Sequence, residues 1–149
     1  MYFILNPAMY SSSDLDRFIS AQEDLFPDAL SEIKNGRKEG HWIWFVFPQV
    51  HGLGVSSLSQ TYAIKSRFEA IAYLYHSVLG PRLKEISEAL LQVEGRTAYE
   101  IMGSPDDMKL QSCMTLFALV SEGDSVFQGV LDKYFGGKLD ERTILLLDT

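Results

Sequence analysis

The sequence predicts an all-α fold, a compact multihelical single domain of about six to seven helices with an ordered aromatic loop. Two observations support this fold class. Apolar residues recur at the 3- and 4-residue spacing of a buried helix face along most of the chain, and no second segment matches the aromatic loop as a partner strand. With 149 residues and 46% hydrophobic content, the chain suits one domain with one core. We assign residues 1–13 to an N-terminal extension and residues 14–149 to the helical domain.

The first two helices are expected before residue 37. Ser13 precedes a helix expected from about 14 to 26, and Asp16 follows it at the spacing of a capping box. Pro27 suits the first position of a second, short helix. Asn35-Gly36 should end that helix, because glycine readily adopts the left-handed conformation found after a helix C-terminus.

An unusually aromatic segment runs from His41 to Gln49 and holds both tryptophans of the chain. Pro48 and the two glycines of Gly52-Leu53-Gly54 weaken any longer helix there, because proline lacks an amide hydrogen. We expect an ordered loop with an aromatic turn of helix at 42–46. A short strand is the competing interpretation, since Trp, Ile, Phe and Val also form strands well.

Two helices and a helical turn are expected in the middle of the chain. The first spans Ser66 to Leu74, and Ser77 is expected to cap the next one. That second helix carries the most regular apolar stripe of the sequence, before Gly95 ends it. The stripe consists of Leu79, Leu83, Ile86, Leu90 and Val93. A short helical turn follows at 97–102.

The last part of the chain predicts three more helices. Ser104-Pro105-Asp106-Asp107 combines a serine cap, a proline at the first position and two acids near the unpaired amides of a helix start. This helix should run to about 122, and another should span Ser125 to Phe135. Asp140 is expected to cap a terminal helix whose segment Ile144 to Leu147 is apolar nearly all round. That segment must dock on the domain or on a partner chain.

Composition argues against several functions. A net charge of −7 opposes nonspecific attraction to nucleic acid or anionic lipid. The single cysteine, Cys113, cannot form an internal disulfide or a thiolate zinc site. No segment approaches the roughly 20 apolar residues that span a bilayer, and the opening residues lack the features of a secretory signal. We therefore expect a cytoplasmic protein with no membrane or nucleic-acid partner, no cofactor and no metal.

Several side chains are candidates for a ligand pocket walled by the aromatic loop. Rings and amides there could stack on and hydrogen-bond a planar ligand, histidines could transfer protons, and cations near helix starts could meet an anion. Each type also has a structural interpretation: core packing for the rings, caps or loop contacts for the histidines, and pairing with nearby acids for the cations. The candidates are His41, Trp44, Phe47, Gln49, Tyr62, His76, Arg82, Asp106 and Lys109.

No catalytic motif is complete. The chain has no Gly-x-Ser-x-Gly elbow, and Gly52-Leu53-Gly54 lacks the third glycine of a dinucleotide fingerprint.

Three function classes remain open. The first is a small-molecule-binding domain or enzyme, and its more specific form has a nucleotide or ADP-ribose-like ligand. This more specific form depends on analogy with helical proteins that act on ADP-ribosyl bonds. The second class is an interaction or accessory protein without catalytic activity, which could form a homo-oligomer. The third, nucleic-acid binding, would need one face to gather Arg37, Lys38, Lys65, Arg67 and Arg82.

Several long phrases resemble the bacterial domain-of-unknown-function family 1810. They are Arg37-Lys38, the aromatic segment His41 to Gln49, Gly52-Leu53-Gly54, Leu79-Gly80-Pro81-Arg82-Leu83, Gly103 to Leu110, and Met114-Thr115-Leu116-Phe117. The resemblance covers about Asp14 to Leu147. It implies a multihelical single domain of uncharacterised activity. Family members are sometimes labelled calpastatin-like, but nothing in this chain resembles an inhibitory repeat.

Overall fold

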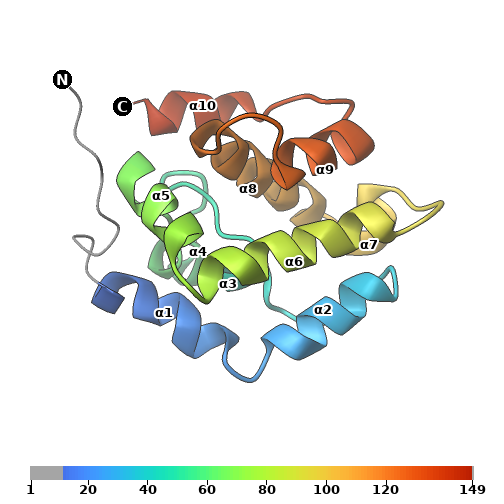
Figure 1. Cartoon of the computed structure of the whole chain (residues 1–149), viewed down its shortest axis with the longest axis horizontal. Helices are drawn as coiled ribbons and strands as arrows, with labels where there is room; N and C mark the ends of the chain where they lie inside the picture. Colours follow the sequence, from blue (N-terminus) through green and yellow to red (C-terminus); the bar gives the residue numbers. More distant parts are fainter. Residues whose placement is uncertain (1–11, 149) are drawn as a thin grey trace.

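The computed structural model describes residues 12–148, which form ten helices and no strand (Figure 1). The all-α prediction is confirmed. Seven helices have seven residues or more, and the other three are single turns. The helices are α1 (Ser12–Gln22), α2 (Phe26–Lys34), α3 (Ile43–Val46), α4 (Ser57–Thr61), α5 (Arg67–Tyr75), α6 (Leu79–Gln92), α7 (Ala98–Met102), α8 (Asp106–Val120), α9 (Val126–Phe135) and α10 (Glu141–Leu147).

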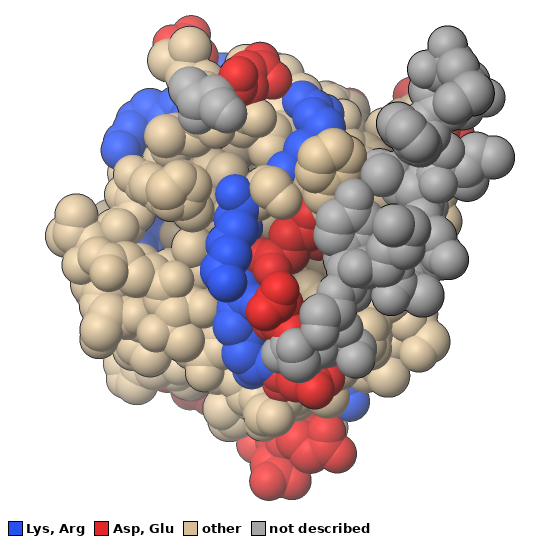
Figure 2. Space-filling model, turned by 90° about the vertical axis from the view of Figure 1, so that its left-hand side faces the viewer, with Lys and Arg blue, Asp and Glu red and all other residues tan. Residues whose placement is uncertain are grey.

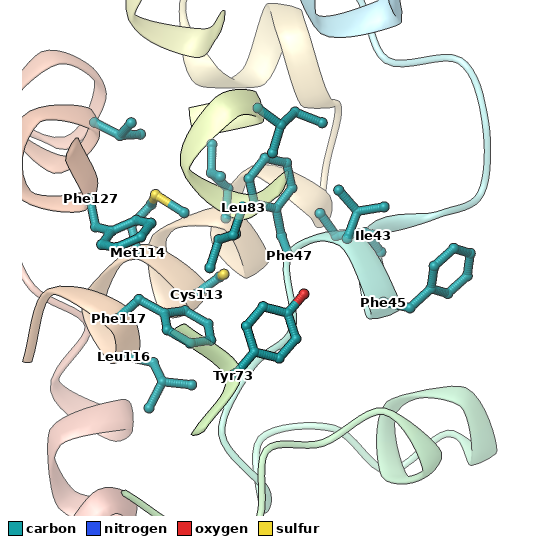
Figure 3. Close-up of a cluster of buried hydrophobic side chains, with 14 of the residues drawn as sticks. Ile43, Phe45, Phe47, Tyr73, Leu83, Cys113, Met114, Leu116, Phe117 and Phe127 are labelled. Atoms are coloured by element: carbon teal, nitrogen blue, oxygen red, sulfur yellow. The ribbon is translucent and has the colours of Figure 1, made fainter. Parts of the chain in front are cut away.

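Two long helices, α6 and α8, organise the domain. Helix α6 packs against α2, α5 and α9, and α8 packs against α3, α5, α7, α9 and α10. Figure 3 shows the core where these helices meet the aromatic loop: Tyr73 of α5 and Phe117 of α8 lie side by side, and Phe47 projects from the loop above them. All three side chains are fully buried. Removal of such large apolar surfaces from water is the main favourable term in folding.

The aromatic segment forms the expected helical turn. The amide groups of Val46 and Phe47 donate to the carbonyls of Trp42 and Ile43 at 3.1 and 3.0 Å, as in a helix. The alternative of a strand is therefore wrong for these residues. Beyond the turn, an isolated bridge joins Val50 to Ile64 and closes the loop that contains α4, a helix the sequence did not predict.

A single arginine holds the closed loop against the first helix. The Arg17 guanidinium donates to the Thr61 and Ala63 carbonyls at 2.9 and 2.8 Å. It also pairs with the Glu69 carboxylate at 2.8 Å, and that carboxylate accepts a bond from the Lys65 amide at 3.0 Å. One buried ion pair thus connects α1, the loop and α5.

A buried glutamine connects α1 to the aromatic turn. The side chain of Gln22 is 1% exposed, and its amide nitrogen donates to the Phe45 carbonyl at 2.7 Å and to the Tyr73 hydroxyl at 3.1 Å. Burial raises the pKa of Tyr73, so its hydroxyl stays protonated and available as a donor. The polar group is therefore satisfied inside the core.

Helix beginnings differ from their predicted form at several positions. Ser77 does not cap α6; the Nδ1 atom of His76 accepts from the Val78 and Leu79 amides at 3.1 and 3.3 Å instead. Ser104 does not cap α8 either. Pro105 precedes that helix after a cis peptide bond, without a side-chain cap. The histidine can replace the serine because its ring nitrogen accepts the same unpaired amides.

The ends of the domain need two further corrections. The first helix ends at Gln22 rather than 26, and α2 begins at Phe26. The predicted cap Ser13 lies within α1, and the residues before Ser12 lie outside the described part of the chain. At the other end, α10 docks on α8 with Leu147 buried, as its apolar sequence predicts.

Between residues 12 and 148, no helix is long and apolar enough to cross a membrane.

Candidate functional site

Glu32 of α2 organises the turn that leads into the aromatic loop. One of its oxygens accepts hydrogen bonds from the Glu39 and Gly40 amides at 2.7 and 2.8 Å, and from the Trp42 indole at 2.9 Å. Burial raises the pKa of Glu32, but these bonds and the nearby Lys38 charge outweigh it and hold the pKa below its usual value. The carboxylate therefore stays ionised at neutral pH and fixes the position of Trp42.

This arrangement predicts an acid-sensitive contribution to stability. Because the folded-state pKa of Glu32 lies below the value of about 4.3 for an unfolded chain, folding favours the ionised form. The stabilisation is complete above that pH and is lost as the pH falls through the lower folded-state pKa. In urea denaturation between about pH 3 and 7, Glu32→Gln should flatten the acid limb of the stability curve relative to wild type. The exposed Glu122→Gln is the control, and an equal flattening in both variants would contradict this role of Glu32.

A buried cation lies next to this turn. The Lys38 side chain is 6% exposed, and its ammonium donates to the Gly40 carbonyl at 2.6 Å and pairs with Asp106 at 2.8 Å. It also lies 5.0 Å from the centre of the Trp42 ring. The structure therefore gives Asp106 an ion-pair partner from the segment after α2, a pairing that was not predicted from the sequence.

Lys109 and Trp44 extend the cluster along the start of α8. The Lys109 ammonium is 3.6 Å from the Asp106 carboxylate and 5.2 Å from the centre of the Trp44 ring. The Trp44 indole nitrogen is buried and has no hydrogen-bond partner among the described residues. Lys109 thus makes the pairing with Asp106 that was one of the two interpretations of this lysine.

Lys38 also lines a cavity. It has a volume of about 370 Å³ and lies between the residues after α2 and the α7 segment. We call it the basic cavity; its lining residues are Arg37, Lys38, Arg96, Tyr99, Glu100, Ile101, Met102 and Gly103. The Lys38 amide donates to the Ile101 carbonyl at 2.7 Å and joins the two walls.

Two arginines and a glutamate set the charge of the basic cavity. Arg37 makes no ion pair with any residue of the described range 12–148, and the Arg96 side chain lies over Gly36, which has a φ of +78°. Glu100 accepts from the Thr97 amide at 2.9 Å in a capping box. That backbone bond is the main cause that lowers the pKa of Glu100, and Arg96 contributes as well. The lining residues Arg37, Lys38, Arg96 and Glu100 carry three positive charges and one negative charge, and Asp106, shared between Lys38 and Lys109, offsets part of the remaining positive charge.

None of the nine candidate residues predicted from the sequence lines the basic cavity. Phe47 is fully buried, so its ring belongs to the core and cannot contact a ligand. Tyr62 packs on Phe45 and Phe18 at ring distances of 5.3 and 5.9 Å. His41 is exposed, and Gln49 is half-buried with its backbone carbonyl bonded to the Ile64 amide.

His76 and Arg82 have structural contacts as well. His76 caps α6, as described above. The Arg82 guanidinium lies 5.4 Å from the Phe26 ring centre and donates to the Gln22 side chain at 3.4 Å. Both residues therefore bind neighbouring elements of the domain, remote from the basic cavity.

The five cations considered for nucleic-acid binding do not share a face. Arg37 and Lys38 follow α2, whereas Lys65 and Arg67 lie at the start of α5, near the opposite end of the molecule (Figure 1). On the face shown in Figure 2, Lys and Arg side chains stand directly beside Asp and Glu side chains.

Metal and thiol chemistry receive no support from the described residues. No group of three or more His, Cys, Asp or Glu side chains between residues 12 and 148 could hold a metal ion. Cys113 is buried, and burial raises the pKa of its thiol well above the usual value. A neutral buried thiol is a poor nucleophile.

Fold and site together define a class: an all-α domain with a basic cavity beside a partly buried lysine-aspartate pair. The chain belongs to the family described as Protein of unknown function (DUF1810), whose model matches residues 12–147. It is also similar to a solved structure, the crystal structure of the conserved hypothetical protein Rv1873 from Mycobacterium tuberculosis. The two share 50% identity over 91% of this chain and 97% of the other, with a TM-score of 0.89. A search of curated proteins finds no match.

Proposed function

We propose that this protein is a small-molecule-binding domain that holds an anionic ligand in the basic cavity. The observation that supports the proposal is the presence of Arg37 and Arg96 around one cavity of about 370 Å³. Ligand pockets in proteins usually measure about 300–1,000 Å³. Guanidinium groups bind phosphate and carboxylate groups in a bidentate manner, and so both arginines suit such a ligand.

The net charge of the protein makes this local excess notable. The whole chain carries −7, so its general field repels anions. The positive charge of the two arginines opposes this repulsion locally, and so the cavity would attract an anion only at short range. Screening by salt limits the repulsion to about 8–10 Å at physiological ionic strength.

The proposal keeps the ligand class expected from the sequence and changes its place. A nucleotide or ADP-ribose-like ligand carries phosphate groups that the two arginines could bind. The proposed ligand site is not at the His41–Gln49 loop but in the cavity between the residues after α2 and the α7 segment. The proposal concerns binding and assigns no reaction.

Titration with inorganic pyrophosphate tests the proposal by calorimetry and thermal unfolding. Saturation at a hundred times the dissociation constant should stabilise the wild-type protein by about 2.7 kcal/mol. Arg96→Gln should weaken binding at least tenfold, or about 1.4 kcal/mol, because one guanidinium is lost. Arg142→Gln on α10 is the matched control, since it removes an exposed cation away from the cavity. No binding by the wild type, or equal losses in both variants, would refute the proposal.

A second candidate, an interaction protein or homo-oligomer, is favoured by large apolar side chains on the surface. Tyr75 is 71% exposed, Leu145 of α10 is 69% exposed and Val55 is 91% exposed. Single exposed apolar residues are common on monomeric proteins, and so this support is weaker than that for the cavity. A molar mass that rises with concentration in sedimentation would favour this candidate.

A further inference from the structure

We infer that the ligand of the basic cavity is a single nucleotide whose base stacks on Tyr99. The inference rests on the proposed function and specifies its ligand. It depends on three features of the cavity: an exposed aromatic ring, two arginines that line the same cavity, and a volume near the lower limit of ligand pockets.

The aromatic ring is available for stacking. Tyr99 lines the cavity and is 63% exposed, and it makes no ring contact with another aromatic side chain in the described range. It occupies the second position of α7, after the Thr97 cap that fixes the start of this helix. Stacking of a base on an aromatic side chain contributes about 1–3 kcal/mol and suits every base, because each has a planar face.

The two arginines that line the cavity with Tyr99 come from two different segments of the chain. Arg96 stands three residues before Tyr99, on the other side of the capped helix start. Arg37 belongs to a separate segment, which the bond between the Lys38 amide and the Ile101 carbonyl holds against α7. A nucleotide matches this arrangement because its base and its phosphate lie at opposite ends of one ribose.

The volume distinguishes one nucleotide from larger ligands. About 370 Å³ is near the lower limit of ligand pockets, which range from about 300 to 1,000 Å³. One nucleotide is the smallest ligand that offers both a base for Tyr99 and a phosphate for the arginines, and the cavity shows no further lining residues for the second half of ADP-ribose or of a dinucleotide. The cavity therefore favours a mononucleotide over the ADP-ribose-like ligand considered from the sequence.

The central experiment compares AMP, ribose 5-phosphate and inorganic pyrophosphate by calorimetry on the full chain. Wild-type protein should bind AMP at least tenfold more tightly than ribose 5-phosphate, which has the same phosphate and sugar but no base. Tyr99→Leu should remove this preference and leave pyrophosphate binding unchanged. Tyr99→Phe is the matched control and should keep the preference, because its ring still stacks. Tyr99 is exposed, so thermal unfolding should show all variants folded.

Glu100→Gln provides an independent test, because this substitution should increase the affinity of the cavity for anions. A glutamine can maintain the capping box with Thr97, so the helix start is preserved while one negative charge leaves the cavity. AMP and pyrophosphate should both bind several-fold more tightly. An unchanged or weaker affinity would contradict the location of the phosphate in this cavity.

The outcomes separate this inference from the proposed function. Equal affinities for AMP and ribose 5-phosphate, or a Tyr99→Leu variant that keeps the preference, would overturn the mononucleotide and leave an anion site. ADP-ribose binding tenfold more tightly than AMP would also overturn it, since the second half would then have its own contacts. Absence of pyrophosphate and AMP binding by the wild type would overturn both proposals.

Discussion

Replacement of Trp42 by alanine should lower the free energy of unfolding by about 3–5 kcal/mol, the usual cost of a buried tryptophan. The ring is 1% exposed and lies 6.0 Å from the Phe47 ring. Its indole nitrogen also donates to Glu32, and its face contacts the Lys38 ammonium. The substitution would therefore leave a cavity and remove a hydrogen bond to a charged group.

Urea denaturation with Trp44→Phe as the matched control measures this effect. Trp44 is half-buried, and its indole nitrogen has no partner in the described residues, so a smaller ring there removes no hydrogen bond. The control should change stability by less than about 1.5 kcal/mol, because the smaller ring removes only part of the contacts of a half-buried side chain. A Trp42→Ala variant that loses less than the control would contradict the packing described for the aromatic turn.

Gly80→Ala should destabilise the protein by about 3 kcal/mol, the upper end of the usual cost of overpacking. A Cβ atom at this position would lie 2.0 Å from the Leu74 carbonyl oxygen and 2.9 Å from its carbon. Both atoms belong to the backbone of α5, so a side-chain rotation cannot relieve the contact. Helices α5 and α6 would have to move apart, and this would disrupt the packing of the core side chains between them.

Gly129→Ala is the control for the glycine test, with an expected change of opposite sign. The new Cβ atom would lie 3.4 Å from a Leu91 methyl group, an ordinary contact. Alanine favours an α-helix interior over glycine by about 1 kcal/mol, so α9 should become more stable. Thermal and urea unfolding of both variants check the pair. Equal stability losses in the two would show that close approach at Gly80 is not the cause.

Periodicity predicted the long helices because it reflects local geometry. The stripe from Leu79 to Val93 follows from the helix period and the need to bury one face, and α6 has both. Caps were less predictable, since several side chains can satisfy the same amides. His76 replaces Ser77 in this role, and no local pattern distinguishes the two. The single turn α4 is too short to show any period.

The candidate site was harder to predict because its residues come from separate segments. Arg96 and Tyr99 were not selected from the sequence, where a lone arginine and a lone tyrosine carry no pattern. Only the fold places them beside Arg37. Glu32 was missed as well, although a buried tryptophan needs an acceptor for its indole nitrogen, and an acid ten residues earlier was a possible signal.

The bond between the Lys38 amide and the Ile101 carbonyl also bears on how a ligand would arrive. The main chain on both sides of the opening is fixed before any encounter, and the Lys38 side chain is anchored to Asp106 beneath it. Because the backbone around the basic cavity is already in place, binding should require little rearrangement of the protein. Association should therefore follow a single kinetic phase. The association rate would then depend on ionic strength through Arg37 and Arg96, which line the cavity.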